Sequence, residues 1–288
     1  MFSVVRGYNI LVIVIAQYLT SIYILAHDIP LREVVLDLNL FVLVLASAFT
    51  IAGGYIINNF YDSDADKINK PIKSKIDGIV SQKIKLRIYF LLNFLGVCFG
   101  FLVSWRAALF FSVYIFLIWL YSHKLKKYPL TGLFSAAILA ILPFFAIFVY
   151  YKNFSEIIFT HAAFLFFILL IRELIKDLEK IKGDFTQNYQ TIPVKYGEKF
   201  TKILITFLSF LTLNPIYFLL KYPEVGGMKY YFYATVIVLV GFIVVLWLAK
   251  NKRNYMLLHL LIKLLIVAGV CSLALIDYSI ILERILLK

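Results

Sequence analysis

Residues 40–66 read LFVLVLASAFTIAGGYIINNFYDSDAD and combine the two features that decide the fold. The first part belongs to an apolar run over residues 36–58, and about 20 apolar residues are enough to cross the roughly 30 Å hydrocarbon layer of a membrane. The last part is polar and acidic and follows the apolar run directly. The stretch therefore predicts a membrane-spanning helix that ends in a cluster of carboxylates.

The composition of the whole chain points to a membrane protein. The 288 residues are 62% hydrophobic and have a mean hydropathy of +0.90, whereas soluble domains are about half apolar. Apolar runs of spanning length fall at residues 9–26, 36–58, 87–104, 107–122, 132–150, 157–174, 201–220, 230–249 and 256–282. The sequence thus predicts an all-α membrane protein, a bundle of about nine transmembrane helices that forms a single domain over residues 1–288.

The formal net charge of +13 would suggest a nucleic-acid partner in a soluble protein. Here the basic residues concentrate in alternate loops, which reflects membrane topology, because cytoplasmic loops retain Lys and Arg. One side holds Arg6 and the basic residues of 67–87, 124–127, 172–202 and 250–253, and the other holds Arg32, Arg106, Lys152, Lys221, Lys229, Arg284 and Lys288. We expect a multi-pass protein of the inner or cell membrane, with a cytoplasmic N-terminus, an outer C-terminus and no nucleic-acid partner.

The first acidic cluster has a regular spacing. Asn58, Asp62 and Asp66 are four residues apart, so on a continuing helix they share one face, while Asp64 points elsewhere. Acids so close repel each other unless a cation lies between them, and oxygen ligands of this kind suit magnesium, which completes its shell with substrate phosphate. The alternative is a solvated helix end that is neutralised by the neighbouring lysines.

A second acidic cluster, residues 172–184, leaves the sixth apolar run in the same way. Asp177 and Asp184 are seven residues apart, two helical turns, and Glu173 lies one turn before Asp177. Two carboxylate clusters at the same membrane depth favour a shared metal site. The alternating Glu and Lys residues fit a salt-bridged exposed helix equally well.

These residues resemble the motifs of the UbiA superfamily of intramembrane prenyltransferases. Asn58, Asp62 and Asp66 match the first motif of that family in full. Three further segments support the match: Asn69-Lys70-Pro71-Ile72, Thr191-Ile192-Pro193-Val194-Lys195-Tyr196-Gly197, and Arg6-Gly7-Tyr8-Asn9 with Gly in place of Pro. Tyr121, Lys124 and Lys126 stand at the place of a Tyr-x-x-x-Lys motif, with Tyr121 and Lys126 one residue further apart than usual. The resemblance covers the whole chain.

The second cluster departs from the family pattern at one position. Relatives carry an acid four residues before the last Asp, where this chain has Lys180. Three alternatives follow: Asp177 and Asp184 hold the second metal ion, with or without Glu173, that ion is bound less tightly, or Lys180 contacts phosphate directly.

The resemblance implies a Mg²⁺-dependent transfer of a prenyl group from a prenyl diphosphate to a small acceptor. The implied metal ligands are Asn58, Asp62, Asp66, Asp177 and Asp184. The implied hydrogen-bond donors to the diphosphate are Lys70, Lys124, Lys126 and Lys176. The resemblance further implies that Tyr121 joins Lys126 in catalysis and that Asn9 and Arg6 lie on the acceptor side. The isoprenoid tail needs an apolar corridor in the bilayer, so we expect a central cavity that is capped by cytoplasmic loops. The pattern looks most like the branch that adds a second geranylgeranyl group to geranylgeranylglyceryl phosphate.

Two other functions stay open at this point. One is prenyl transfer to an aromatic acceptor, such as 4-hydroxybenzoate or a precursor of a quinone or haem. The other is a membrane transporter, since many-helix proteins with acids that face inward often move ions. The sequence leaves the acceptor, the prenyl chain length and the oligomeric state undetermined.

Overall fold

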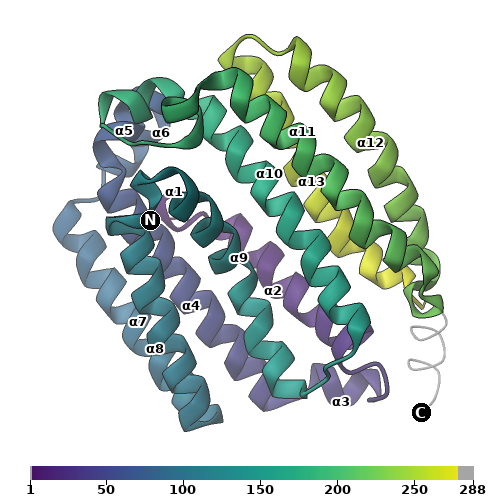
Figure 1. Cartoon of the computed structure of the whole chain (residues 1–288). Coiled ribbons are helices and arrows are strands. Elements are labelled where there is room, and N and C mark those ends of the chain that lie inside the picture. The colour runs from purple at the N-terminus through teal and green to yellow at the C-terminus, as the bar shows by residue number, and fades with distance from the viewer. Residues whose placement is uncertain (1, 278–288) are drawn as a thin grey trace. The chain divides into compact units, whose positions relative to one another are not determined.

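The computed structural model describes residues 2–277, which form helices and connecting turns without any strand in this range. The α-helices are α1 Phe2–Val5, α2 Gly7–Thr20, α3 Leu31–Val35, α4 Leu38–Tyr61, α5 Ser63–Asn69, α6 Pro71–Gly78, α7 Gln82–Val103, α8 Trp105–His123, α9 Pro129–Tyr151, α10 Glu156–Thr186, α11 Ile192–Lys221, α12 Lys229–Leu248 and α13 Lys252–Ser272 (Figure 1). A π-helical turn, η1 Ser21–Leu25, extends α2, and the 3₁₀ turns are η2 Leu125–Lys127, η3 Pro223–Met228 and η4 Leu273–Leu275. In the described part, nine helices are long and apolar enough to cross a membrane, which confirms the predicted fold class.

Several helices extend beyond the predicted apolar runs, most of all α10, which ends at Thr186 and not at residue 174, and α11, which begins at Ile192 and not at residue 201. The third and fourth spans are separated at Ser104, whose extended backbone ends α7 and whose hydroxyl accepts a hydrogen bond from the Ala107 amide at 3.1 Å. The sequence placed this break at Trp105 and Arg106, but a serine that caps the next helix is the stronger signal. The predicted ninth span ran to residue 282, and its residues beyond 277 lie outside the described part.

The described residues form two compact units. The first unit contains residues 2–18, Leu36–Tyr150 and Lys182–Thr191, and the second contains Leu19–Val35, Tyr151–Ile181 and residues 192–277. The last turn of α10 thus belongs to the first unit and the rest of that helix to the second. The expectation of a single domain stays a prediction.

In the first unit, α4 packs against α7 and α8. Small residues allow the close approach of α4 and α7: a Cβ atom on Gly53 would lie 2.7 Å from the Asn93 side chain, and one on Gly96 would lie 2.7 Å from the Thr50 hydroxyl. Membrane helices pack closely through such small residues, because apolar burial alone gives little attraction in lipid. This packing fixes the carboxyl-terminal end of α4.

A buried polar network ties the segment after α4 to the rest of the first unit. Asp77 accepts hydrogen bonds from Asn59 at 2.9 Å, Lys73 at 2.9 Å and Ser3 at 2.8 Å, and Lys85 donates to Asn59 at 2.9 Å. Burial alone would raise the pKa of Asp77, but the hydrogen bonds from Lys73 and Ser3, with the positive charges of Lys73 and Lys85, lower it below its ordinary value. The network holds α6 and α7 against the end of α4.

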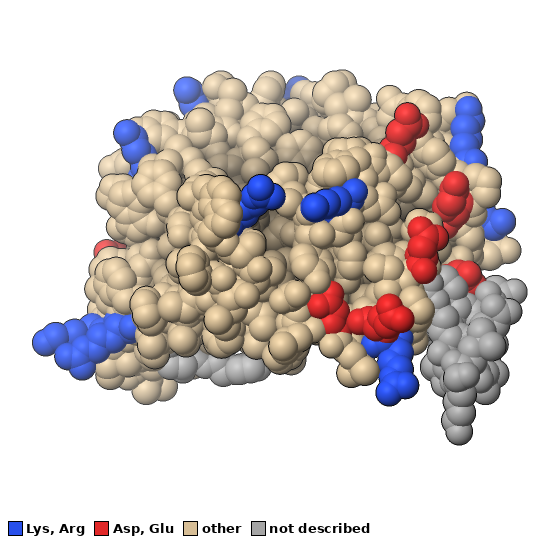
Figure 2. Space-filling model, turned by 90° about the horizontal axis from the view of Figure 1, so that it is seen from below, with Lys and Arg blue, Asp and Glu red and all other residues tan. Residues whose placement is uncertain are grey.

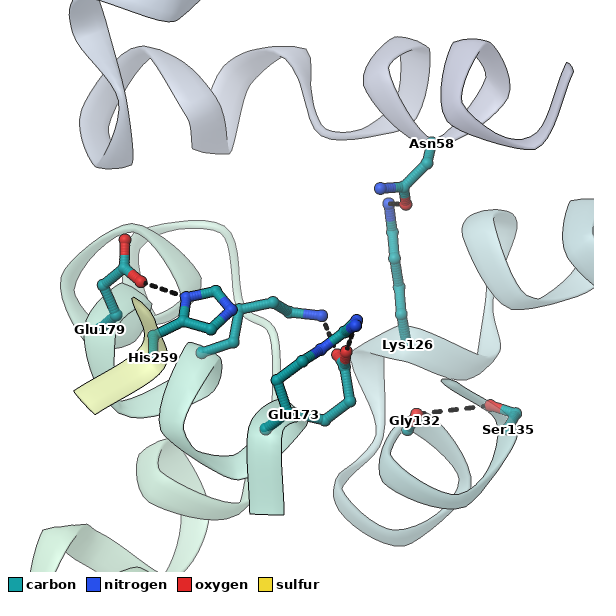
Figure 3. Close-up of polar contacts among 9 residues, drawn as sticks. Asn58, Lys126, Gly132, Ser135, Glu173, Glu179 and His259 are labelled. Atoms are coloured by element: carbon teal, nitrogen blue, oxygen red, sulfur yellow. Dashed lines mark hydrogen bonds and ion pairs between the residues drawn. The ribbon is translucent and has the colours of Figure 1, made fainter. Parts of the chain in front are cut away.

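In the second unit, α12 packs against both α11 and α13. Near the ends of these helices, Lys202 donates to the Ala249 carbonyl at 2.6 Å and pairs with Glu198 at 2.9 Å. Glu179 of α10 pairs with His259 of α13 at 2.9 Å (Figure 3). Figure 2 shows a face of the structure that is mostly uncharged, with scattered Lys, Arg, Asp and Glu side chains.

Candidate active site

The first motif lies at a junction of two helices. Helix α4 ends at Tyr61, and Asp62 leaves the helical conformation with φ −89° and ψ 2°. Backbone hydrogen bonds nevertheless run from Asp62 to Asn58 at 2.9 Å, from Asp66 to Asp62 at 2.8 Å and from Lys70 to Asp66 at 2.8 Å. The sequence predicted an uninterrupted helix; the chain bends at Asp62 but keeps the four-residue register.

The acids of this segment differ in burial. Asp62 is 8% exposed and Asp66 is 9% exposed, whereas Asp64 is exposed and forms an ion pair with Lys67 at 2.8 Å. The alternative of a solvated helix end that is neutralised by neighbouring lysines fits Asp64 but does not fit the buried Asp62 and Asp66. A buried carboxylate needs a positive charge or several hydrogen bonds to remain ionised.

Lys126 supplies a positive charge to this site. From the 3₁₀ turn η2, its Nζ donates to Asp62 Oδ1 at 2.5 Å. The same Nζ donates to Asn58 Oδ1 at 3.4 Å (Figure 3). The same nitrogen lies 5.9 Å from the centre of the Tyr61 ring and 5.8 Å from that of Tyr189. An ammonium group therefore sits between two oxygens of the first motif.

Asp184 lies near the acids of the first motif. The Tyr189 hydroxyl donates a hydrogen bond to Asp62 at 3.5 Å, and burial together with the negative charges of Asp62, Asp184 and Asp66 raises the pKa of Tyr189. Three carboxylates from two distant segments thus act on one hydroxyl group. We call Asp62, Asp66 and Asp184 the acidic centre. No three His, Cys, Asp or Glu side chains lie close enough to hold a metal ion together within residues 2–277.

The remaining acids of the second cluster belong to the second unit. Glu173 is buried and pairs with Arg172 at 2.7 Å and with Lys176, so this lysine has an acidic partner on its own helix. Asp177 and Lys180 are half-buried on α10.

The residues at the place of the Tyr-x-x-x-Lys motif differ in burial. Lys126 is buried, Lys124 is exposed and Tyr121 is half-buried. Lys70, half-buried at the junction of α5 and α6, lines an open groove with Pro71 and other residues of α6. Only the structure distinguishes Lys126 from Lys124, because the turn η2 decides which lysine points toward α4.

The side chains of the two N-terminal candidates, Asn9 and Arg6, both contact Tyr55. The Asn9 side chain donates to the Tyr55 hydroxyl at 3.3 Å, and the Arg6 guanidinium lies 5.2 Å from the centre of the Tyr55 ring. Arg6 has a φ of 49°, an uncommon conformation for a residue other than glycine, and such residues concentrate at functional sites. Tyr55 is seven residues before Asp62 and therefore lies on the same helical face.

A family model described as the UbiA prenyltransferase family matches residues 12–277. The chain belongs to this family. Among its relatives, a digeranylgeranylglyceryl phosphate synthase of Methanobrevibacter smithii is 30% identical over 70% of this chain and 71% of the relative. Family membership favours prenyl transfer over the transporter alternative.

Solved structures share the fold of this prenyltransferase. A structure described as a digeranylgeranylglyceryl phosphate synthase has a TM-score of 0.68 and 22% identity and covers 94% of this chain and 95% of its own. A UbiA homologue from Archaeoglobus fulgidus, bound to DMAPP and Mg²⁺, has a TM-score of 0.68 and 15% identity over 95% of this chain and 98% of its own. At these identities the likeness shows the fold.

Sequence reasoning missed Tyr189, Tyr55 and His259, and it named Asn69 only as part of a motif, without its contact. Tyr189 and Tyr55 contact candidate site residues, Asn69 contacts Gly183, and His259 pairs with Glu179. Helical register could have identified Tyr55. The other three contacts join segments that are far apart in the chain, and no local pattern signals them.

Proposed function

We propose that this prenyltransferase moves a geranylgeranyl group from a prenyl diphosphate to geranylgeranylglyceryl phosphate with Mg²⁺ as cofactor. The observation that carries the proposal is the acidic centre, in which Asp62, Asp66 and Asp184 act together on the Tyr189 hydroxyl. The names of the relatives support this acceptor. In the reaction the C1–oxygen bond to diphosphate breaks, the acceptor oxygen bonds to C1, and the acceptor hydroxyl loses its proton.

The residues of the acidic centre suit Mg²⁺. Their side chains offer carboxylate oxygens, Asn58 adds an amide oxygen, and Mg²⁺ prefers oxygen ligands and shares its shell with substrate phosphates. The Lys126 ammonium lies between Asn58 and Asp62, so this site already favours a cation. When bound, Mg²⁺ would neutralise the charge that develops on the departing diphosphate. Asp177, two turns before Asp184 on α10, stays a proposed ligand.

We assign Lys126 the most direct role toward the diphosphate. Its ammonium is within reach of the acidic centre, and a hydrogen bond from an ammonium group to phosphate is stronger than one between neutral groups. Tyr121, at the start of the same motif, remains a proposed catalytic partner. The proposed further donors are Lys70, Lys124 and Lys176, of which Lys176 must first leave its partner Glu173.

The acceptor is proposed to bind near Tyr55. Arg6 carries a permanent positive charge, suited to the phosphate of an amphiphilic acceptor. Asn9 is held in place by the Tyr55 hydroxyl. The side chains of these three residues can therefore orient the acceptor hydroxyl toward C1 of the donor.

The protein is an integral multi-pass membrane protein. We propose that its N-terminus is cytoplasmic, because the loops on that side carry most of the basic residues. The proposed position of the C-terminus, on the outer side, falls on residues 278–288, outside the described part.

A product assay tests this function. Purified protein is incubated with Mg²⁺, labelled geranylgeranyl diphosphate and either geranylgeranylglyceryl phosphate or 4-hydroxybenzoate. We expect a lipid phosphate product only with the first acceptor and only with Mg²⁺. Product from the aromatic acceptor alone would overturn the acceptor assignment, and full activity of Asp62→Ala would overturn the site.

A further inference from the structure

The acidic centre needs a contact that holds its two halves together. Asp62 and Asp66 come from the junction of α4 and α5, whereas Asp184 comes from the end of α10. Like charges in a buried site repel each other. Because Mg²⁺ coordination tolerates little error in distance, the protein must fix this spacing before the ion binds.

An uncharged side chain connects the two segments. The amide nitrogen of Gly183 donates to Oδ1 of Asn69 at 3.2 Å, in a buried contact between residues 114 positions apart. Asn69 is 5% exposed and lies three residues after Asp66. Gly183 immediately precedes Asp184. Each partner of the contact is thus next to, or one turn from, a carboxylate of the acidic centre.

Gly183 has the shape that this contact requires. A Cβ atom on Gly183 would lie 2.4 Å from Nδ2 and 2.5 Å from Cγ of Asn69, closer than atoms can pack. Gly183 lies inside α10, where glycine is among the least favourable residues. Its backbone is not in the left-handed region that would demand glycine. The fit to Asn69 is therefore the structural reason for a glycine here.

Backbone hydrogen bonds hold the residues after Asp184 to the first unit. The Tyr189 amide donates to the Asp184 carbonyl at 2.9 Å, and the Gln190 amide donates to the Lys127 carbonyl at 2.8 Å. These bonds hold the segment after α10 beside η2. The bond from Gly183 to Asn69 instead joins the last turn of α10 itself to the segment that carries Asp66.

We propose that Asn69 is a positioning residue, which binds the Gly183 amide and thereby sets the distance between Asp66 and Asp184 for Mg²⁺ and diphosphate. The inference rests on the proposed function of the acidic centre. Asn69 itself contacts neither the ion nor the substrate in this role. Its loss should weaken the binding of Mg²⁺ with diphosphate more than it weakens the fold.

A double-mutant cycle tests the contact. The variants are Asn69→Ala, Gly183→Ala and the double variant, and the readout is the Mg²⁺ concentration that gives half of the thermal stabilisation by geranylgeranyl diphosphate. We expect this concentration to rise about tenfold in Asn69→Ala and more in Gly183→Ala, because an error of about 1 Å in a site can cost up to about a hundredfold. The double variant should behave like Asn69→Ala alone, since removal of the side chain makes room for the added methyl group.

The matched control is Gly78→Ala. Gly78 is also helical, and a Cβ atom there would meet nothing within 4 Å, so its Mg²⁺ requirement should equal that of the wild type. Equal effects of Gly183→Ala in both backgrounds, or no effect in either, would overturn the inference. If Gly183→Ala alone does not fold, recovery of folded protein in the double variant supports the contact, and failure of the double variant when Asn69→Ala folds overturns it.

Asp62→Ala separates this inference from the proposed function. If Asp62→Ala abolishes Mg²⁺-dependent binding and Asn69→Ala leaves it unchanged, the positioning role is wrong and the proposed function stands. If Asp62→Ala binds Mg²⁺ and diphosphate like the wild type, the proposed function fails.

Discussion

Two acidic regions of this prenyltransferase are organised in opposite ways. In the acidic centre, carboxylates from two distant segments meet near Lys126 and Tyr189. Along α10, by contrast, Glu173 pairs with cations one and three residues away, and Glu179 pairs with His259. The first arrangement concentrates negative charge and favours an added cation, whereas the second neutralises its acids within the second unit. Similar sequence patterns therefore form the proposed binding site in one place and ion pairs within one unit in the other.

The largest difference between these regions should appear on removal of one carboxylate. We expect Asp62→Ala to lower the rate of prenyl transfer by about a thousandfold, because the stabilisation of a leaving group depends on such preorganised charge. Glu179→Gln, which removes the negative charge of a carboxylate on α10, should lower it by less than about tenfold, because loss of its buried pair with His259 costs stability and not leaving-group stabilisation. Steady-state rates at saturating Mg²⁺ measure both. A greater loss in Glu179→Gln than in Asp62→Ala would reverse the comparison.

The next effect concerns the lysine of the acidic centre. Lys126→Met removes the buried ammonium and should lower kcat/KM for the prenyl diphosphate by about a hundredfold. Lys124→Met is the control, because Lys124 is exposed, and it should stay within about threefold of the wild type. Equal losses in the two variants would show that the net positive charge of the loop matters and that the position of Lys126 does not.

The sequence predicted the membrane spans and the first motif because both depend on local patterns. Apolar length identifies a span, and four-residue spacing places Asn58 and Asp62 on one face. The contact between Asn69 and Gly183 and the position of Tyr189 depend on how distant segments pack. The preference for Lys126 over Lys124 also depends on the turn η2, whose direction spacing does not determine.

A smaller effect is expected on the thermal stability of the protein when the buried ion pairs of α10 are broken. Glu173→Gln leaves Arg172 and Lys176 without their buried acid, and broken buried pairs are destabilising. We expect the thermal midpoint in detergent to fall by about 5 °C, in line with the loss of one or two kcal/mol. Glu33→Gln, at an exposed site on α3, is the control and should not change the midpoint. An unchanged midpoint in Glu173→Gln would argue that this pairing is not structural.

The smallest effect is a dependence of stability on pH at the polar network. The folded pKa of Asp77 lies below its ordinary value, so its stabilising contribution is present above the unfolded pKa of about 4 and is lost as the pH falls through the folded pKa. Thermal midpoints measured as the pH falls below about 4 should therefore drop more in the wild type than in Asp77→Asn. Asp28→Asn, at an exposed position, should retain the wild-type profile. Parallel profiles for the wild type and Asp77→Asn would contradict the assignment.

The most direct test of the acidic centre is an experimental structure of the protein with Mg²⁺ and geranylgeranyl diphosphate. The account predicts metal ions between the diphosphate and the carboxylates of Asp62, Asp66 and Asp184, with Lys126 Nζ turned from Asp62 toward a phosphate oxygen. A diphosphate bound elsewhere, with Lys126 still on Asp62 and no ion at Asp184, would contradict it.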